Sequence, residues 1–157
     1  METTTTISTD NKLKTNNFKP KFKVGDWIIG RATENEPRQI AEVTKDGYKT
    51  TYGGWIGSSF EEEIHLWTIE DAKDGDVIFY DSGWTCIFKY IHGIWYSSHC
   101  FITADGEFHT GYEEHSIDAK MNGNAHPATK EQRDRLFRRM KKTGYEWDSE
   151  KKELNKI

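Results

Sequence analysis

Cysteine and long apolar runs are both scarce in this sequence. Cys86 and Cys100 are the only cysteines in 157 residues, too few for the disulfide framework of a small secreted protein. No stretch approaches the ~18 apolar residues of a membrane-spanning helix. The first residues are rich in Thr and Asn and lack the apolar segment of a signal peptide. These absences favour a soluble protein in the cytoplasm.

The chain is polar but rich in aromatic residues. Hydrophobic residues make up 34% of it and charged residues 31%, whereas six Trp, seven Tyr and eight Phe raise the aromatic share to 13%. Each aromatic side chain buries ~150–250 Å², so a few of them suffice for a core. Most of the chain is therefore expected to fold.

Charge is unevenly distributed along the chain. The net charge of -4 divides into +2 over residues 1–21, -10 over residues 22–128 and +4 over residues 129–157. An acidic body is atypical of nucleic-acid-binding proteins, which present a basic surface to phosphates.

A short motif occurs twice, fifty residues apart. Lys23-Val24-Gly25-Asp26 and Lys73-Asp74-Gly75-Asp76 each precede three apolar residues. Glycine permits the backbone bend and aspartate can bond neighbouring amides, so each motif predicts a turn that leads into a buried strand. Because a hairpin pattern follows each copy, the sequence predicts an internal repeat of two β units.

The first predicted hairpin covers residues 39–52 and turns at Asp46-Gly47, a favoured two-residue loop. Strand alternation then puts one set of side chains on the core face, and these are Ala41, Val43, Tyr48, Thr50 and Tyr52.

The second predicted hairpin covers residues 84–101 and turns at His92-Gly93. It is apolar on both faces, so it lies inside the protein or at an interface. One face contains Trp84, Phe88, Tyr90, Trp95 and Phe101, and the other contains Ile87, Ile91, Ile94 and Tyr96. This register pairs Cys86 with His99 and places Cys86 and Cys100 on opposite faces, so no disulfide is expected between them.

The clearest local signal is a capping box. Thr129 and Gln132 predict a helix that runs to about Lys142, with Gly144 as its stop, and a small hairpin should follow and fold back on the helix. Thr68 and Asp71 predict a second, shorter capped turn. Residues 111–127 contain polar and flexible residues and are expected to form a loop.

Together these signals predict a mostly β (α+β) fold. It consists of two tandem small SH3-like β-barrel units and a C-terminal helix–hairpin. The expected organisation is a flexible tail (1–20), a first unit (21–68), a second unit (69–120), and a linker with the helix–hairpin (121–157).

The usual signs of catalysis and metal binding are missing. The histidines lack metal-ligand spacing, and in the predicted register His99 and Cys100 point to opposite faces. Cys86 beside His99 is more typical of a small core residue than of a nucleophile. The acidic run Glu61-Glu62-Glu63 is typical of a solvated patch. We therefore expect no enzyme activity, no catalytic residue, no metal and no cofactor.

Several segments resemble a widespread group of short proteins encoded by bacteriophages and prophages of gut bacteria. The matching stretches are His65–Val77, Pro127–Asp134 and Gly144–Asp148, and Phe22–Ile29 fits the same group. They cover about a fifth of the chain and are structural in kind. The resemblance implies a phage or prophage protein in the cytoplasm of a bacterial host, and it assigns no activity.

A binding module is the function that these observations favour. A protein partner suits the aromatic-rich, two-faced hairpin, Trp55 beside two glycines, and the acidic body, since Tyr and Trp are enriched at interfaces. The same aromatic residues could instead fill a small core. The phage setting suggests a host or phage protein, with a role in host takeover or against host defence. The alternative is nucleic-acid binding through the basic helix. The candidate binding residues are Trp55, Trp84, Trp95, Arg135, Arg138, Arg139 and Lys142.

Overall fold

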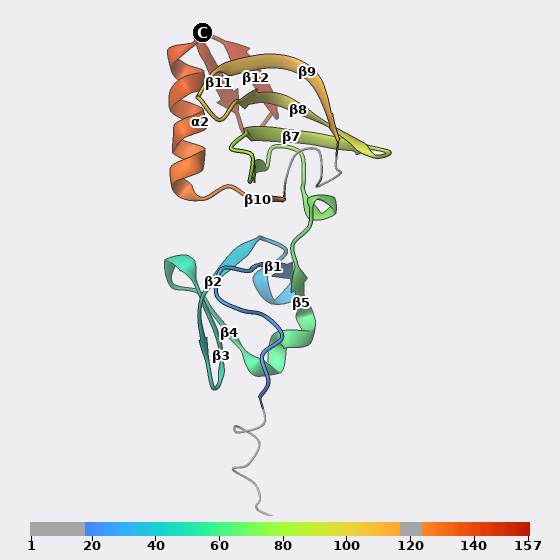
Figure 1. The fold of residues 1–157 in the computed structure, drawn as a ribbon, viewed down its shortest axis with the longest axis vertical. Helices are drawn as coiled ribbons and strands as arrows, with labels where there is room; N and C mark the ends of the chain where they lie inside the picture. Colours follow the sequence, from blue (N-terminus) through green and yellow to red (C-terminus); the bar gives the residue numbers. More distant parts are fainter. Residues whose placement is uncertain (1–17, 117–123) are drawn as a thin grey trace, which may run out of the picture. The chain divides into compact units, whose positions relative to one another are not determined.

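The structure, a computed structural model, describes residues 18–116 and 124–157, with residues 111–116 described by their backbone alone (Figure 1). The chain divides into two compact units, Met1–Trp67 and Thr68–Ile157. Both are mostly β, as the sequence predicts. The predicted tail lies mainly outside the described residues.

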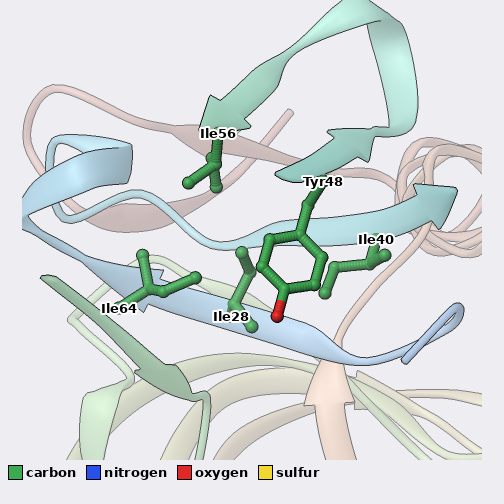
Figure 2. Close-up of a cluster of buried hydrophobic side chains, with 5 residues drawn as sticks. All are labelled: Ile28, Ile40, Tyr48, Ile56 and Ile64. Carbon is green, nitrogen blue, oxygen red and sulfur yellow. The ribbon is translucent and has the colours of Figure 1, made fainter. Parts of the chain in front are cut away.

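The first unit contains a five-stranded antiparallel sheet in the order β4-β3-β2-β1-β5. Its strands are β1 (Trp27–Gly30), β2 (Arg38–Thr44), β3 (Gly47–Thr50), β4 (Trp55–Gly57) and β5 (Ile64–Leu66). Short 3-10 turns η3 (Arg31–Thr33), η4 (Thr51–Gly53) and η5 (Ser58–Glu63) connect them. Figure 2 shows the core between these strands, formed by Ile28, Ile40, Tyr48, Ile56 and Ile64.

The second unit contains another five-stranded antiparallel sheet, in the order β10-β6-β7-β8-β9. After the 3-10 turn η6 (Ile69–Asp71) come β6 (Val77–Tyr80), β7 (Thr85–His92), β8 (Trp95–Ile102), β9 (Phe108–Ser116) and β10 (Ala125–Pro127). The helix α2 (Lys130–Lys142) and the hairpin of β11 (Tyr145–Asp148) and β12 (Glu153–Lys156) complete the unit.

The Lys-x-Gly-Asp motif forms a tight turn before β1. Gly25 has a φ of 95°, a conformation that glycine adopts without steric cost. Its N–H donates to the carbonyl of Ile40 at 2.8 Å, and the N–H of Ile40 donates to the carbonyl of Asp26 at 2.9 Å. The Asp26 carboxylate accepts from the N–H of Lys23 at 3.0 Å.

The second copy of the motif repeats this turn before β6. Gly75 has a φ of 96°. Its N–H donates to the carbonyl of Phe88 at 2.8 Å, and the N–H of Phe88 donates to the carbonyl of Asp76 at 2.7 Å. The N–H of Lys73 donates to the Asp76 carboxylate at 2.9 Å. The strand order is the same in both units when each is numbered from its own first strand. The predicted repeat is therefore a repeat of backbone geometry.

Both sheets are open in the part of the chain that the structure describes. The strand orders end at β4 and β5 in the first unit and at β10 and β9 in the second, and no ladder joins these outer strands. The pairing thus confirms two β units and does not confirm barrels.

The predicted register of the first hairpin is wrong by one residue. Thr44 pairs with Gly47 and Val43 with Tyr48, so Lys45-Asp46 forms the loop. Gly47 opens β3 with a φ of 153°, a positive value that residues with a side chain rarely adopt. A Cβ on Gly47 would lie 2.3 Å from the carbonyl oxygen of Ile56, so close approach of β4 requires this glycine.

A bulge between Ile40 and Glu42 changes the core face further. It turns Ile40 into the core and leaves Ala41 exposed, whereas the prediction had Ala41 inside. Tyr52 is 82% exposed and belongs to η4, beyond the strand that the prediction extended to it.

The register of the second hairpin also differs from the prediction. His92 pairs with Trp95, so Gly93-Ile94 is the loop, and Gly93 supplies a φ of 66°. Bulges on either side of Phe88 shift the pairing. They place Phe88 on Tyr96, with ring centroids 5.8 Å apart, although the predicted alternation puts these rings on opposite faces.

The base of this hairpin lies inside the second unit, one of the two predicted environments. Ile87, Cys100 and Ile102 are buried on the face that packs against Leu136 and Met140 of α2. Cys100 pairs with Ile87 and Cys86 with Phe101, which puts the two cysteines on opposite faces. Both thiols are free and buried.

Both predicted capping boxes are confirmed. The Thr129 hydroxyl accepts from the N–H of Gln132 at 3.3 Å, and the Gln132 side chain accepts from the N–H of Thr129 at 2.9 Å. Gly144 follows the helix with a φ of 95°, and the hairpin of β11 and β12 comes directly after it. The shorter box at Thr68 and Asp71 is also present.

The loop predicted for residues 111–127 is only partly a loop. β9 continues to Ser116, and β10 pairs with β6 from Ala125 to Pro127. A strand that ends in proline is tolerated because β10 is an outer strand, where an N–H of the ladder is dispensable. Residues 117–123 lie outside the described residues.

α2, with thirteen residues, is the longest helix that the structure describes. Within that part of the chain, no helix combines the length and the apolar character that crossing a membrane requires.

Candidate functional site

An exposed apolar hairpin tip is the most distinctive surface feature of the second unit. It consists of the end of β7, the loop, and the start of β8, and we call it the finger. Its four large apolar side chains are Tyr90 (45% exposed), Ile91 (36%), Ile94 (64%) and Trp95 (39%). In Figure 1 the yellow-green hairpin of β7 and β8 projects to one side of the unit.

The local sequence explains why the finger is exposed while the base of the hairpin is buried. Residues 85–88 of β7 are all buried, and residues 89–92 are all exposed. The change coincides with the bulges around Phe88, where the strand bends. Beyond this point α2 no longer covers the hairpin, because its buried contacts are with Ile87, Cys100 and Ile102.

Few charges accompany the apolar side chains of the finger. Lys89 is the only residue with a formal charge between Lys89 and Tyr96, and His92 is the only other titratable group apart from the tyrosines. The neighbouring strand differs, because β9 pairs with β8 here and places Glu114 opposite Ser97 and Glu113 opposite Ser98. The apolar character is therefore limited to the tip of the hairpin.

Two of the three predicted tryptophans lie outside the finger. Trp84 is at the other end of the hairpin, where it is 36% exposed and stacks on Phe101, with ring centroids 4.9 Å apart and an interplanar angle of 5°. Its contact is thus part of the fold. Trp95 lies in the finger, about 25 Å away along an eight-residue strand.

Trp55 belongs to the first unit, where it is 52% exposed on β4. Phe60 is also exposed, at 50%. Both aromatic side chains lie beside Gly57, since a Cβ on Gly57 would be 3.8 Å from each of them. Trp55 is therefore an exposed aromatic residue of its own unit and is not part of the finger.

The four predicted basic residues do not act as one group. Arg135 donates to the carbonyl of Ala104 at 2.9 Å, and the Nε of Arg139 donates to the carbonyl of Gly106 at 2.6 Å. Both therefore hold the turn between β8 and β9 against α2. Arg138 and Lys142 are exposed, and together with Arg139 and Lys141 they line an open depression.

The two cysteines have the properties of core residues. Burial raises the pKa of the Cys86 thiol, and it raises the pKa of Cys100 to about 12. A nucleophilic cysteine instead requires a depressed pKa and access to solvent. The buried neighbours of Cys86 include Tyr96, whose pKa is also raised, chiefly by burial. These observations argue against Cys86 as a nucleophile activated by His99.

His99 is engaged elsewhere. Its Nε2 lies 2.7 Å from a carboxylate oxygen of Asp74 in the second Lys-x-Gly-Asp turn, and its ring centroid lies 4.7 Å from that of Trp147 on β11. His99 therefore connects β8, the turn and the C-terminal hairpin. Among the described residues, no group of three or more His, Cys, Asp or Glu is placed to hold a metal ion.

The acidic run in η5 is only partly solvated, which corrects the prediction. Glu61 is 9% exposed and accepts hydrogen bonds from the Tyr48 hydroxyl and from the N–H of Lys21, the latter at 3.1 Å. The N–H of Phe22 donates to the Tyr48 oxygen at 3.3 Å. Burial and the hydrogen bond to Glu61 raise the pKa of Tyr48 to about 12. This network fastens the segment before β1 to the core.

Removing the Tyr48 hydroxyl should destabilise the first unit in a pH-dependent way. At neutral pH, Tyr48→Phe is expected to cost about 1–3 kcal/mol, because Glu61 and two main-chain N–H groups lose a buried partner. The pKa of Tyr48 in the folded protein, about 12, exceeds the ordinary tyrosine pKa of about 10. The wild-type advantage is therefore complete below pH ~10 and lost as pH rises toward ~12. Urea unfolding of both proteins at neutral and alkaline pH measures this, and a constant difference would contradict it.

Comparison with known proteins adds no functional assignment to this geometry. No family model matches the chain, and no curated protein matches it.

Proposed function

We propose that the protein acts by binding, without catalysis, and that the finger inserts into an apolar recess of a partner protein. The observation that supports this most is the concentration of four exposed large apolar side chains at one hairpin tip. Ile91 pairs with Tyr96 and Trp95 with His92, so these side chains lie on both faces of the tip. Large apolar side chains exposed together at one tip are a usual mark of interaction sites. Trp and Tyr are also the residues most often found at the energetic centre of protein interfaces.

The geometry of the finger favours an inserted knob over a flat contact. Ile94 is at the loop, and Trp95 pairs with His92 beside it, so these side chains lead the hairpin. The bulges and the buried base fix the hairpin before binding, which reduces the entropy lost on association.

The setting that we propose is the cytoplasm of a bacterium that contains a phage or prophage. It rests on the resemblance of residues 65–77, 127–134 and 144–148 to phage and prophage proteins of gut bacteria. The partner is accordingly a host or phage protein, with host takeover or countering of host defence as the role. Two free buried thiols are compatible with a reducing compartment.

We also propose that both units are open relatives of SH3-like barrels. The support is the shared strand order, in which a fifth strand returns to pair with the first. In the first unit the 3-10 turn η5 precedes that fifth strand. In both units the Lys-x-Gly-Asp turn fixes the start of the first strand.

A paired capture experiment tests the role of the finger. Tagged wild-type protein and the variant Ile94→Ser/Trp95→Ser are incubated with nuclease-treated lysate of a gut bacterium, and retained proteins are quantified. The expected result is one stoichiometric partner on the wild type and at least a tenfold loss on the variant, equivalent to about 1.4 kcal/mol. Ile94 is 64% exposed and Trp95 39%, so circular dichroism and thermal unfolding are used to verify that the variant stays folded.

Trp55→Ser is the matched control, since Trp55 is an even more exposed tryptophan in the other unit. It should retain the partner fully. Loss of the partner with Trp55→Ser and not with the finger variant would move the site to the first unit. A parallel capture from lysate without nuclease completes the test, and retention seen only there would favour nucleic-acid binding instead.

Nucleic-acid binding through Arg135, Arg138, Arg139 and Lys142 is less well supported as the main function. Arg135 and Arg139 each donate to a main-chain carbonyl, which reduces their capacity for phosphates. The sheet that α2 covers is acidic, with nine Asp or Glu and two Lys in residues 68–116.

A further inference from the structure

The C-terminal half of α2 presents a basic surface that the finger does not explain. Residues 135–142 contain five Lys or Arg and no Asp or Glu. Four of the five, Arg138, Arg139, Lys141 and Lys142, line one open depression. We call these four the basic face. It differs from the set expected from the sequence, because Lys141 belongs to it and Arg135 does not.

Internal contacts neutralise this surface only in part, because Arg138 lowers the pKa of Asp134 and Arg139 lowers that of Asp105, each as a minor cause beside hydrogen bonds to those carboxylates. Arg139 bonds the carbonyl of Gly106 through Nε, which anchors its guanidinium beside the depression that it helps to line. In the described part of the chain, no carboxylate forms an ion pair within 4.0 Å of Arg138, Lys141 or Lys142. The first half of α2 differs, since Lys130 pairs with Asp134 at 2.9 Å.

We infer that the basic face is a contact surface for the phosphate backbone of nucleic acid, independent of the finger. The first argument is charge complementarity at matching spacing. Arg138, Lys141 and Lys142 follow one another at i, i+3 and i+4, so they share one side of the helix. They span about 6 Å along its axis, the length of about two phosphate steps of one strand.

The absence of exposed apolar residues on this part of the helix argues against a membrane surface. Interfacial helices bury an apolar face beside their cations. Here Leu136 and Met140 are buried against the sheet, and Phe137 packs on the same core. An acidic protein segment is the remaining alternative ligand, and a poly-glutamate peptide tests for it.

The acidic sheet and the small number of cations limit the strength of this contact. Three to four cations predict weak, sequence-independent binding, with dissociation constants of about 10⁻⁴–10⁻⁶ M at physiological salt. The slope of log K against log salt should be about -3. Such binding would add a weak tether to a protein whose main affinity comes from elsewhere.

Fluorescence anisotropy of a short labelled DNA duplex, titrated with the full chain at several salt concentrations, tests this inference. Between 50 and 200 mM salt the wild type should lose about 60-fold in affinity, the value for a slope near -3. Arg138→Gln/Lys142→Gln should bind more weakly and lose only about fourfold over the same range.

Two controls isolate the basic face from net charge and from the finger. Lys151→Gln/Lys156→Gln changes the net charge equally, at two exposed lysines outside the basic face, and should keep the wild-type slope. The finger variant should keep it as well. Comparable circular dichroism and thermal midpoints establish that all variants are folded.

Three results would overturn the inference. They are the absence of salt-dependent binding by the wild type, an unchanged slope in Arg138→Gln/Lys142→Gln, and tighter binding to a labelled poly-glutamate peptide than to the duplex. The last result would identify an acidic protein as the ligand class. None of them bears on capture of a protein by the finger, so the two proposals fail separately.

Discussion

Replacing Leu136 with Ala is expected to lower the free energy of unfolding of the second unit by about 2–5 kcal/mol, the range for buried Leu→Ala substitutions. Leu136 is 0% exposed and belongs to the cluster that joins α2 to β7 and β8. A cavity at Leu136 would remove packing between α2 and the buried face of the hairpin, which consists of Ile87, Cys100 and Ile102.

Denaturant unfolding of the full chain measures this loss, with Arg133→Ala as the control on the same helix. Arg133 is exposed, so its substitution should change stability by less than about 0.5 kcal/mol. Equal stabilities of the two variants would show that α2 does not hold the second unit together.

Gly30→Ala is expected to cost the first unit about 3 kcal/mol or more, at the upper end for overpacked sites. A Cβ on Gly30 would lie 2.1 Å from the carbonyl oxygen of Glu63, a main-chain atom that cannot swing aside. Because Gly30 pairs with Ile64, the substitution forces β1 and β5 apart.

Gly57→Ala in the same sheet is the matched control. Gly57 has a φ of -69°, and a Cβ there would meet nothing closer than 3.8 Å. It should be neutral or stabilise the unit by up to about 1 kcal/mol, because alanine narrows the unfolded ensemble. Thermal unfolding of both variants measures the two changes in stability. A Gly30→Ala variant as stable as the wild type would disprove the close approach of β1 and β5.

Local signals were sufficient to predict the elements that depend on neighbouring residues. The capping boxes at Thr68 and Thr129 close within three residues, so they form without help from the rest of the fold. The Lys-x-Gly-Asp turns are similarly local, which explains why a repeat was visible in the sequence.

Strand registers could not be predicted because tertiary contacts decide them. Asp46-Gly47 has the composition of a two-residue loop, yet Gly47 serves the approach of β4 and the loop moves back by one residue. The bulges beside Ile40 and Phe88 leave no mark in the alternation of apolar residues. Each bulge therefore reversed the predicted faces beyond it.

The candidate site was predicted in part. Trp95 is exposed in the finger, whereas Trp84 is held by Phe101 and Arg135 by Ala104. The finger is identified by the change in β7 from buried to exposed residues, which occurs at Lys89. The position of this change depends on how far α2 reaches along the hairpin. The distance that α2 covers along the hairpin cannot be predicted from composition alone.

Site-specific photo-crosslinking tests the central claim, that the finger enters a partner protein, most directly. A photoreactive amino acid replaces Ile94 in one protein and Trp55 in another, and both are irradiated in nuclease-treated bacterial lysate. Binding through the finger predicts one discrete protein adduct from position 94 and none from position 55. An adduct from position 55 alone, or none from position 94 while a partner is still captured, would contradict it.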